Sequence, residues 1–285
     1  MQPPTIKKTS GSEVKTALKT LLYADAGWGK TTQAVFMEKK YGKTLILSGE
    51  AGLNSISNHD MDYVTFSSYK DEPKPNTSRL HDLQDWILSD DFQKIDYKCI
   101  VLDSLTEASS LIRDEVRKEH GNKPNPVMWG DIKNATLGLV KQIRDLPLHV
   151  LVTALRQTNN DENGATHYGP ACGGVSTQNE VMGVFDFVFG GTKKPVTATD
   201  PATGNSHLMS VHHVMAGEQD GWKAKAREPL TVGKRRRRIR PETRTGNITA
   251  LFDDLEMSDE QWQQKVDAIQ KQREQHAKQT EGAKQ

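Results

Sequence analysis

The chain has 285 residues, of which 35% are hydrophobic, and its 38 Lys and Arg nearly balance its 37 Asp and Glu, leaving a net charge of +1. This length allows one large domain with appendages, and no apolar run of about 18 residues is present to predict a membrane span. Cys99 and Cys172 lack the spacing of metal ligands, which excludes a cysteine-rich metal site and fits a reducing, cytoplasmic setting.

Apolar strand patterns alternate with helical patterns along most of the chain. The predicted strands cover residues 20–24, 44–48, 63–67, 99–103, 149–154, 183–190 and 208–215. The predicted helices cover residues 30–40, 79–89, 105–120 and 129–145. Short apolar strands separated by helices of about ten or more residues are typical of a mostly parallel sheet covered on both faces. The sequence therefore predicts an α/β fold, with a hairpin between the last two strands.

The first predicted strand runs into a glycine-containing loop that precedes a helix. In this setting the order Gly29-Lys30-Thr31 is typical of a loop that binds nucleotide phosphates through its backbone N–H groups. Lys30 is predicted to reach the β- and γ-phosphates, and the Thr31 hydroxyl to hold Mg²⁺. Ala24 stands where the usual pattern begins with glycine, which predicts a variant of the loop. The predicted nucleotide-binding residues are Ala24, Asp25, Ala26, Gly27, Trp28, Gly29, Lys30, Thr31 and Thr32.

Two carboxylates follow later strands of the predicted sheet. Glu50 comes just after the second strand, and Asp103 ends the apolar fourth strand. Ligands of open α/β folds bind at the carboxyl ends of the strands, so Asp103 is predicted to hold Mg²⁺ and Glu50 to deprotonate an attacking water. A helix cap for Asp103 and a plain surface position for Glu50 are the alternatives. With Lys30, these residues predict an ATPase that uses ATP and Mg²⁺.

Positive charge is concentrated in residues 223–244, where ten Lys and Arg accompany two Glu. Such a run is typical of salt-dependent contact with nucleic-acid phosphates, which is independent of base sequence. A solvated charge run is the alternative. The predicted DNA-binding residues of this run are Lys234, Arg235, Arg236, Arg237, Arg238 and Arg240.

A polar segment over residues 157–174 follows the strand at 149–154. Arg156 and Gln157 stand at its beginning, and His167 and Tyr168 lie inside it. A mobile loop with a cation and an aromatic ring is able to track a single strand and stack a base. We therefore predict that Arg156 and Gln157 contact DNA, with an ordinary polar surface loop as the alternative.

The motifs at 24–32, 45–50 and 100–104 resemble the RecA-like recombinase core in their order and spacing. The likeness is greatest to compact phage-encoded RecA-like P-loop ATPases of the single-strand annealing and recombination type, over about residues 18–232. Residues 151–157 are similar to the strand that leads into the family's DNA-contacting loop. Residues 173–174 and 184–189 resemble the glycine pair and strand that close this loop. The resemblance implies ATP- and Mg²⁺-dependent binding of single-stranded DNA, with hydrolysis stimulated by DNA.

The resemblance also implies how the protein assembles and where it acts. The segment 223–230 resembles one whose lysines reach ATP across a subunit interface, so Lys223 and Lys225 are expected to act in trans within a ring or filament. A single-strand DNA-binding protein is a possible further partner, and the host cytoplasm is the expected location if a phage encodes the chain.

One feature of the family is not matched. The usual Asn or Gln sensor after the fourth core strand is not clearly placed, because Ala154 and Leu155 stand in its neighbourhood. Either Arg156 or Gln157, which follow, or neither of them, contacts the γ-phosphate. Two other functions therefore stay open. One is a nucleotide-gated annealing scaffold that does not hydrolyse ATP, and the other is a P-loop kinase of a nucleotide or small molecule.

Composition divides the chain into four predicted parts. These are a flexible arm over 1–16, the ATPase core over 17–232, a basic linker over 233–257, and a helix with a frayed tail over 258–285. Ser258 and Gln261 predict a capping box at the beginning of this helix, where Trp262, Val266 and Ile269 fall on one face.

Overall fold

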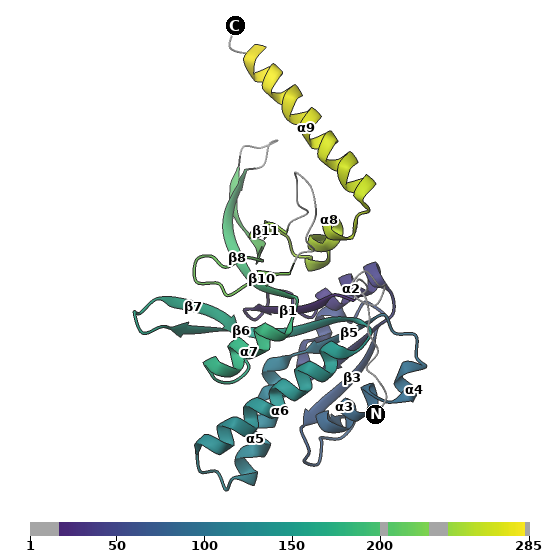
Figure 1. Cartoon of the computed structure of the whole chain (residues 1–285), viewed down its shortest axis with the longest axis vertical. Coiled ribbons are helices and arrows are strands. Elements are labelled where there is room, and N and C mark those ends of the chain that lie inside the picture. The colour runs from purple at the N-terminus through teal and green to yellow at the C-terminus, as the bar shows by residue number, and fades with distance from the viewer. Residues whose placement is uncertain (1–16, 200–204, 228–238, 283–285) are drawn as a thin grey trace, which may run out of the picture. The chain divides into compact units, whose positions relative to one another are not determined.

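The computed structural model describes residues 17–199, 205–227 and 239–282 of the chain (Figure 1). These residues belong to two compact units. The larger unit contains the residues up to Arg227 together with residues 240–248, and the smaller unit contains Ile239 and the residues from Thr249 onward. The functional boundaries proposed from composition stay a prediction.

One sheet forms the centre of the larger unit. Its strand order is β11-β9-β8-β1-β6-β5-β2-β3-β4, and the neighbours from β8 to β3 are parallel. Strand β7 pairs with β6, and β10 pairs with β8. The strands are β1 (Lys19–Ala24), β2 (Thr44–Ser48), β3 (Asp62–Ser68), β4 (Ser78–Arg79), β5 (Cys99–Asp103), β6 (His149–Asn160), β7 (Thr166–Pro170), β8 (Phe187–Thr199), β9 (Ser206–Met215), β10 (Lys225–Ala226) and β11 (Glu242–Arg244). The α/β fold with a mostly parallel central sheet is confirmed.

Helices cover both faces of this sheet. They are α2 (Gln33–Tyr41), α3 (Leu80–Ile87), α4 (Asp90–Gln93), α5 (Leu105–Glu119), α6 (Pro126–Asp145) and α7 (Val175–Val184), with a 3-10 turn η1 (Ala51–Ile56). The chain crosses the sheet in one direction from β1 to β2, and in the other from β4 through β5 and β6 to β8. Because parallel crossovers are right-handed, α2 lies on one face and α3, α5, α6 and α7 on the other. Figure 1 shows α5 and α6 side by side, away from α2.

The central strands are buried on both faces. Every residue of β2 and β5 is buried, and β1 is buried from its second residue onward. Strands covered on both sides read as continuous apolar runs. This is why the sequence predicts β2 and β5 with their observed bounds.

Two sequence predictions for residues 157–190 are wrong. The segment 157–174 is not a simple loop, because β6 continues to Asn160 and pairs antiparallel with β7. The strand predicted at 183–190 begins later, because residues 175–184 form helix α7 and β8 begins at Phe187. Gln178, buried in α7, donates from Nε2 to the Pro170 carbonyl over 3.0 Å and so ties the helix to β7. This contact between a side chain and a backbone carbonyl leaves no pattern in the sequence.

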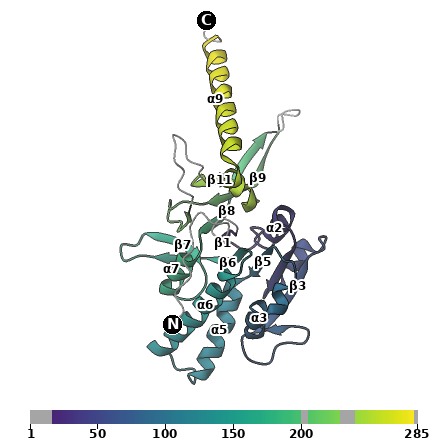
Figure 2. The same cartoon turned by 45° about the vertical axis from the view of Figure 1, so that its right-hand side comes forward.

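Strands β8 and β9 form a long antiparallel ribbon that begins inside the sheet. They pair from Gly190 opposite Met215 to Thr199 opposite Ser206, and Figure 2 shows them side by side. The predicted hairpin is confirmed, with strands longer than predicted because their outer halves are mostly exposed and lack a continuous apolar run.

The smaller unit contains α8 (Asp253–Glu256) and α9 (Asp259–Gly282), after the 3-10 turn η2 (Ile248–Phe252). The predicted capping box is confirmed, since Ser258 N–H donates to Gln261 Oε1 over 2.8 Å and Gln261 N–H donates to Ser258 Oγ over 3.2 Å. Val266 is buried on the predicted apolar face. In the described ranges, no helix has the length and apolar character needed to cross a membrane.

Candidate functional site

The loop between β1 and α2 lies at the carboxyl edge of the central sheet. Gly27 and Gly29 have φ angles of 72° and 100°, in the left-handed region that favours glycine. These conformations curve the backbone between a buried strand and a helix N-terminus, which is where N–H groups and the helix dipole gather around an anion. This loop, which we call the phosphate loop, contains eight of the nine predicted nucleotide-binding residues, from Asp25 to Thr32 and including Ala26, and the ninth, Ala24, ends β1.

The Trp28 side chain anchors this loop and does not face a ligand. The indole is 1% exposed, and its Nε1 donates to the Thr192 carbonyl on β8 over 3.0 Å. On the same strand, Lys193 Nζ donates to the Gly27 carbonyl over 2.7 Å. Two side-chain bonds therefore tie the loop to the base of the β8–β9 ribbon.

A neighbouring strand accounts for Ala24 at the first position of the loop. Ala24 is fully buried and lies opposite Gly191 in the parallel pairing of β1 with β8. A Cβ added at Gly191 would lie 2.9 Å from the Ala24 Cβ and 2.7 Å from the Trp28 ring. The space that a first glycine provides in the usual motif is therefore supplied here by Gly191.

The Lys30 ammonium lies at the centre of the loop. It is 7% exposed, and Nζ donates to the carbonyls of Ala24 and Asp25 over 3.2 and 3.1 Å. Burial lowers the pKa of Lys30, and the carboxylates of Glu50, Asp103 and Asp25 oppose this shift. A nucleotide phosphate offers this cation a stronger acceptor than backbone carbonyls do.

Asp103 and Thr31 meet as predicted for a magnesium site. The Thr31 hydroxyl donates to Asp103 Oδ2 over 2.6 Å. A Cβ at Gly52 would lie 2.8 Å from Thr31 Oγ1 and 3.6 Å from Asp103 Oδ2, so the glycine keeps space open beside this oxygen pair. Mg²⁺ prefers such oxygen ligands together with substrate phosphates, and the residues present fit this ion. The other carboxylate oxygen of Asp103 accepts a hydrogen bond from the buried Thr153 hydroxyl.

Glu50 lies at the same edge, where β2 ends, and is fixed by the residue that follows Asp103. The Ser104 hydroxyl donates to Glu50 Oε1, and the peptide bond between Asp103 and Ser104 is cis. Glu107, in the first turn of α5, lies close by, with its Cγ 3.0 Å from where a Cβ of Gly49 would be. Burial and then the neighbouring Glu50 raise the pKa of Glu107. Two carboxyl groups therefore share this side of the site.

Arg156 connects the phosphate loop to the β6–β7 hairpin. It is the first residue of β6 beyond the parallel pairing with β1, and its Nε donates to Asp25 Oδ1 over 2.9 Å. The guanidinium lies over the rings of Tyr168 and Trp222, at 4.8 and 5.6 Å from their centres. Arg156 and Tyr168, predicted to face a single strand, are thus in contact with each other and with the loop.

Gln157 belongs to a chain of amides inside the same hairpin. Its Nε2 donates to Asn159 Oδ1 over 3.1 Å, and Asn159 Nδ2 donates to Gln178 Oε1 on α7 over 3.0 Å. The hairpin is therefore connected to α7 on one side and to the phosphate loop on the other.

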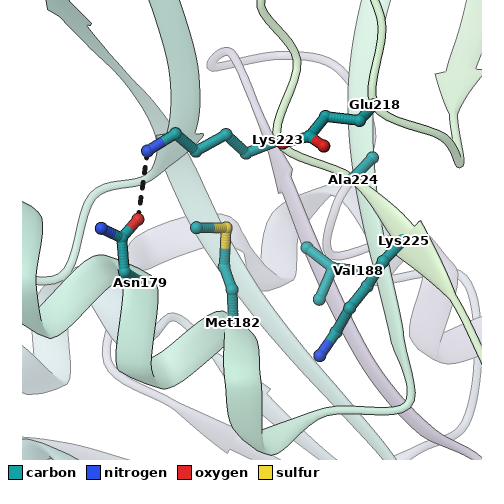
Figure 3. A pocket seen from close by; sticks show the side chains of 7 residues that line it. All are labelled: Asn179, Met182, Val188, Glu218, Lys223, Ala224 and Lys225. Atoms are coloured by element: carbon teal, nitrogen blue, oxygen red, sulfur yellow. Dashed lines mark hydrogen bonds between the residues drawn. The ribbon is translucent and has the colours of Figure 1, made fainter. Parts of the chain in front are cut away.

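Lys223 and Lys225 line a pocket of about 320 Å³ beside α7. Lys223 Nζ donates to Asn179 Oδ1 over 3.1 Å, and Lys225 Nζ donates to the Gly183 carbonyl over 3.3 Å. Figure 3 shows both lysines with Met182 and Val188 in this pocket. Burial lowers the pKa of Lys225, with a smaller contribution from Arg227. Within the chain, the two lysines contact α7 and not the phosphate loop.

Five of the six DNA-binding residues predicted in the basic run, Lys234 to Arg238, lie outside the described residues. Arg240 is described and exposed, two residues before β11.

Sequence reasoning missed Thr153, Ser104, Glu107 and the pairing of Arg156 with Asp25. Ser104 and Glu107 fit a capping pattern, and the Ser104 hydroxyl does accept from the Glu107 N–H over 3.3 Å. That pattern could have marked them as neighbours of Glu50. Thr153 and the pairing of Arg156 with Asp25 depend on strands adjacent in space and carry no sequence signal.

Comparisons with known proteins extend this picture. Residues 16–228 match a protein family described as an AAA domain. Among solved structures, a prototypical ATPase from the type III secretion system of pathogenic bacteria is similar over 60% of this chain, with 14% identity and a TM-score of 0.41. The match spans 50% of that ATPase. No curated protein matches. Because the family match extends over well more than half of the length, the chain belongs to the AAA-domain family of P-loop ATPases.

Proposed function

We propose that this protein binds single-stranded DNA in an ATP- and Mg²⁺-dependent manner, acts in recombination of the phage type by strand annealing or exchange, and hydrolyses ATP at the phosphate loop. One observation carries the proposal. Lys30, Thr31, Asp103 and Glu50 converge at the carboxyl edge of the sheet, and Arg156 connects this edge to a polar hairpin.

The arrangement of the side chains supports hydrolysis. Lys30 would exchange its loop carbonyls for the β- and γ-phosphates, and Thr31 and Asp103 would hold Mg²⁺. Bound there, Mg²⁺ neutralises the charge that develops on the phosphoryl oxygens. Glu50 keeps one carboxylate oxygen on Ser104, and its second oxygen is the base for the attacking water.

The DNA-binding part rests on charge and on the hairpin. Arg156, Gln157 and Arg240, together with residues 234–238, would contact phosphates without reading bases. Arg156 is bound to Asp25 of the phosphate loop. A DNA strand whose phosphates bind this guanidinium would therefore change the surroundings of the nucleotide.

The assembly part of the proposal concerns Lys223 and Lys225. In a ring or filament, a second copy would approach the pocket that they line, and its nucleotide would compete with α7 for their ammonium groups. A single-strand DNA-binding protein is the proposed additional partner on DNA.

A second candidate, an annealing scaffold gated by nucleotide without hydrolysis, is favoured by the bond between Ser104 and Glu50. This bond occupies one carboxylate oxygen of Glu50 and leaves only the other to orient a water. Annealing that persists in Glu50→Gln would support the scaffold.

ATP hydrolysis with and without single-stranded DNA tests the proposal. We expect DNA to stimulate the wild type, Lys30→Ala to abolish nucleotide binding, and Glu50→Gln to bind ATP while turnover falls about 10²–10⁴-fold. Lys94→Ala, which removes an exposed lysine paired with Asp91, is the control. Unchanged ATP affinity in Lys30→Ala would refute the site, and failure to bind DNA would favour a small-molecule kinase.

A further inference from the structure

Thr153 is a polar residue in the buried centre of the sheet. It lies on β6 between β1 and β5, with the fully buried apolar residues Val152 and Ala154 on either side. The Thr153 side chain is also fully buried. Its hydroxyl donates to Asp103 Oδ1, and the Leu102 carbonyl, at 3.4 Å, is a longer contact of the same oxygen.

Each oxygen of the Asp103 carboxylate is thereby bound by a different hydroxyl. Thr153 binds Oδ1 from β6, and Thr31 binds Oδ2 from the phosphate loop over 2.6 Å. Two donors on opposite oxygens fix the rotation of a carboxylate about its final bond. Of the two, Thr31 is itself a predicted Mg²⁺ ligand, so Thr153 is the partner that stays outside the metal shell.

We infer that Thr153 is a positioning residue that aims the Asp103 carboxylate at the metal. The inference rests on the proposed function, because it requires Mg²⁺ between Thr31 and the nucleotide. Partners of this kind orient the ligands of a metal, and their loss commonly weakens metal binding about 10–100-fold. Deleting the hydroxyl would free the carboxylate to rotate, while the phosphate-binding backbone of the loop would keep its conformation.

The chain offers a matched control on the neighbouring strand. Thr20 lies on β1, is 1% exposed, and its hydroxyl has no hydrogen-bond partner within the part of the chain that the structure describes. Thr153→Val and Thr20→Val are the same substitution at two buried strand positions, and only the first removes a bond to Asp103. Thr153→Ser restores the donor.

The experiment is binding of a fluorescent ATP analogue to the full chain, titrated with Mg²⁺ and repeated in EDTA. We expect the Mg²⁺ concentration at half-maximal binding to rise tenfold or more in Thr153→Val, with affinity in EDTA unchanged. Thr20→Val should match the wild type, and Thr153→Ser should return toward it. If Thr153→Val does not fold, Thr153→Cys, which retains a weaker donor, should show a smaller shift in the same direction.

Two outcomes would contradict the inference, and they are distinguishable. In the first, nucleotide binding by the wild type depends on Mg²⁺ and the Thr153 variants show the same dependence. In that case Thr153 only provides a hydrogen bond to a buried carboxylate and does not position it for the metal. If nucleotide binding by the wild type is indifferent to Mg²⁺, the proposed function fails as well.

Discussion

Glu107 is in an unfavourable electrostatic position beside the predicted base. Burial, and then repulsion from Glu50, raise its pKa above the ordinary value of 4.5. A carboxyl group with a raised pKa is more stable protonated than ionised in the folded state, so its ionisation at neutral pH costs stability. The energetic cost is localised at the edge of the sheet that Glu50 occupies.

Replacing Glu107 with Gln should therefore stabilise the protein at neutral pH. The raised pKa of Glu107 contributes to the free energy of unfolding. This contribution is fully present below the unfolded pKa of 4.5 and is lost as pH rises through the folded pKa. Thermal unfolding of Glu107→Gln and wild type should then differ at pH 7 and converge below pH 4.5. Glu180→Gln is the control of opposite sign, because Lys133 lowers the pKa of Glu180. A melting-temperature gain for Glu107→Gln that does not change with pH would contradict this explanation.

At the scale of elements, the close approach of β1 and β8 shapes the phosphate loop. Gly191 faces Ala24 and Trp28, and Gly190 faces Trp222, so both contacts depend on the absence of a side chain. The loop conformation is thus set by a strand far away in sequence, as well as by its own glycines.

Gly191→Ala should displace the loop. The added Cβ would lie 2.7 Å from the Trp28 ring, so the ring or the strand must move, which by analogy with other overpacked cores costs about 1–3 kcal/mol. We expect lower stability and weaker ATP binding, measured by denaturant unfolding and nucleotide titration. Gly138→Ala inside α6 meets no atom within 4 Å and should gain up to about 1 kcal/mol. Wild-type ATP affinity in Gly191→Ala would show that the contact is unimportant for the loop.

Sequence-based prediction succeeded where structure is encoded locally. The buried runs of β2 and β5, the Gly-Lys-Thr loop and the Ser258 capping box are each determined by neighbouring residues. It failed at α7, where Gln178 binds the Pro170 carbonyl of β7, and at the extent of the β6–β7 hairpin. Within the proposed site, Lys30, Thr31 and Asp103 can be proposed from the sequence because their motif is contiguous or ends a strand. Thr153 and Arg156 meet their partners, Asp103 and Asp25, only because the order of strands in the sheet brings them together, which the sequence does not show.

At the scale of the whole molecule, Asp25 and Arg156 connect two proposed binding regions. Asp25 belongs to the phosphate loop, while Arg156 stacks on Tyr168 of β7. A link between two sites changes both affinities by the same factor, whichever ligand binds first. Nucleotide and DNA should therefore affect each other's binding through this pair.

Asp25→Asn should weaken this coupling. Loss of the carboxylate leaves Arg156 without its ionic partner on the phosphate loop, so DNA should change ATP affinity less than in the wild type. The measurement is ATP affinity with and without single-stranded DNA, over a range of salt because phosphate contacts weaken as salt rises. Asp96→Asn, which disrupts an exposed pair with Lys98, is the control. If DNA changes ATP affinity equally in Asp25→Asn and in the wild type, this pair does not carry the coupling between the two sites.

The buried Gln33 on α2 has a practical consequence for deleting the basic run. Its Nε2 donates to the carbonyls of Gly29 and Gly246, both over 2.9 Å, and its Oε1 accepts from the Ile248 N–H over 3.0 Å. Gly246 and Ile248, which follow the basic segment 234–238, are thus hydrogen-bonded to the helix after the phosphate loop, and Arg227, which precedes this segment, is bound to Asp186 at 3.2 Å. Cutting the chain after Arg227 would remove two of the three hydrogen-bond partners of Gln33, Gly246 and Ile248. A deletion of the basic segment should therefore be internal and retain residues 240–248.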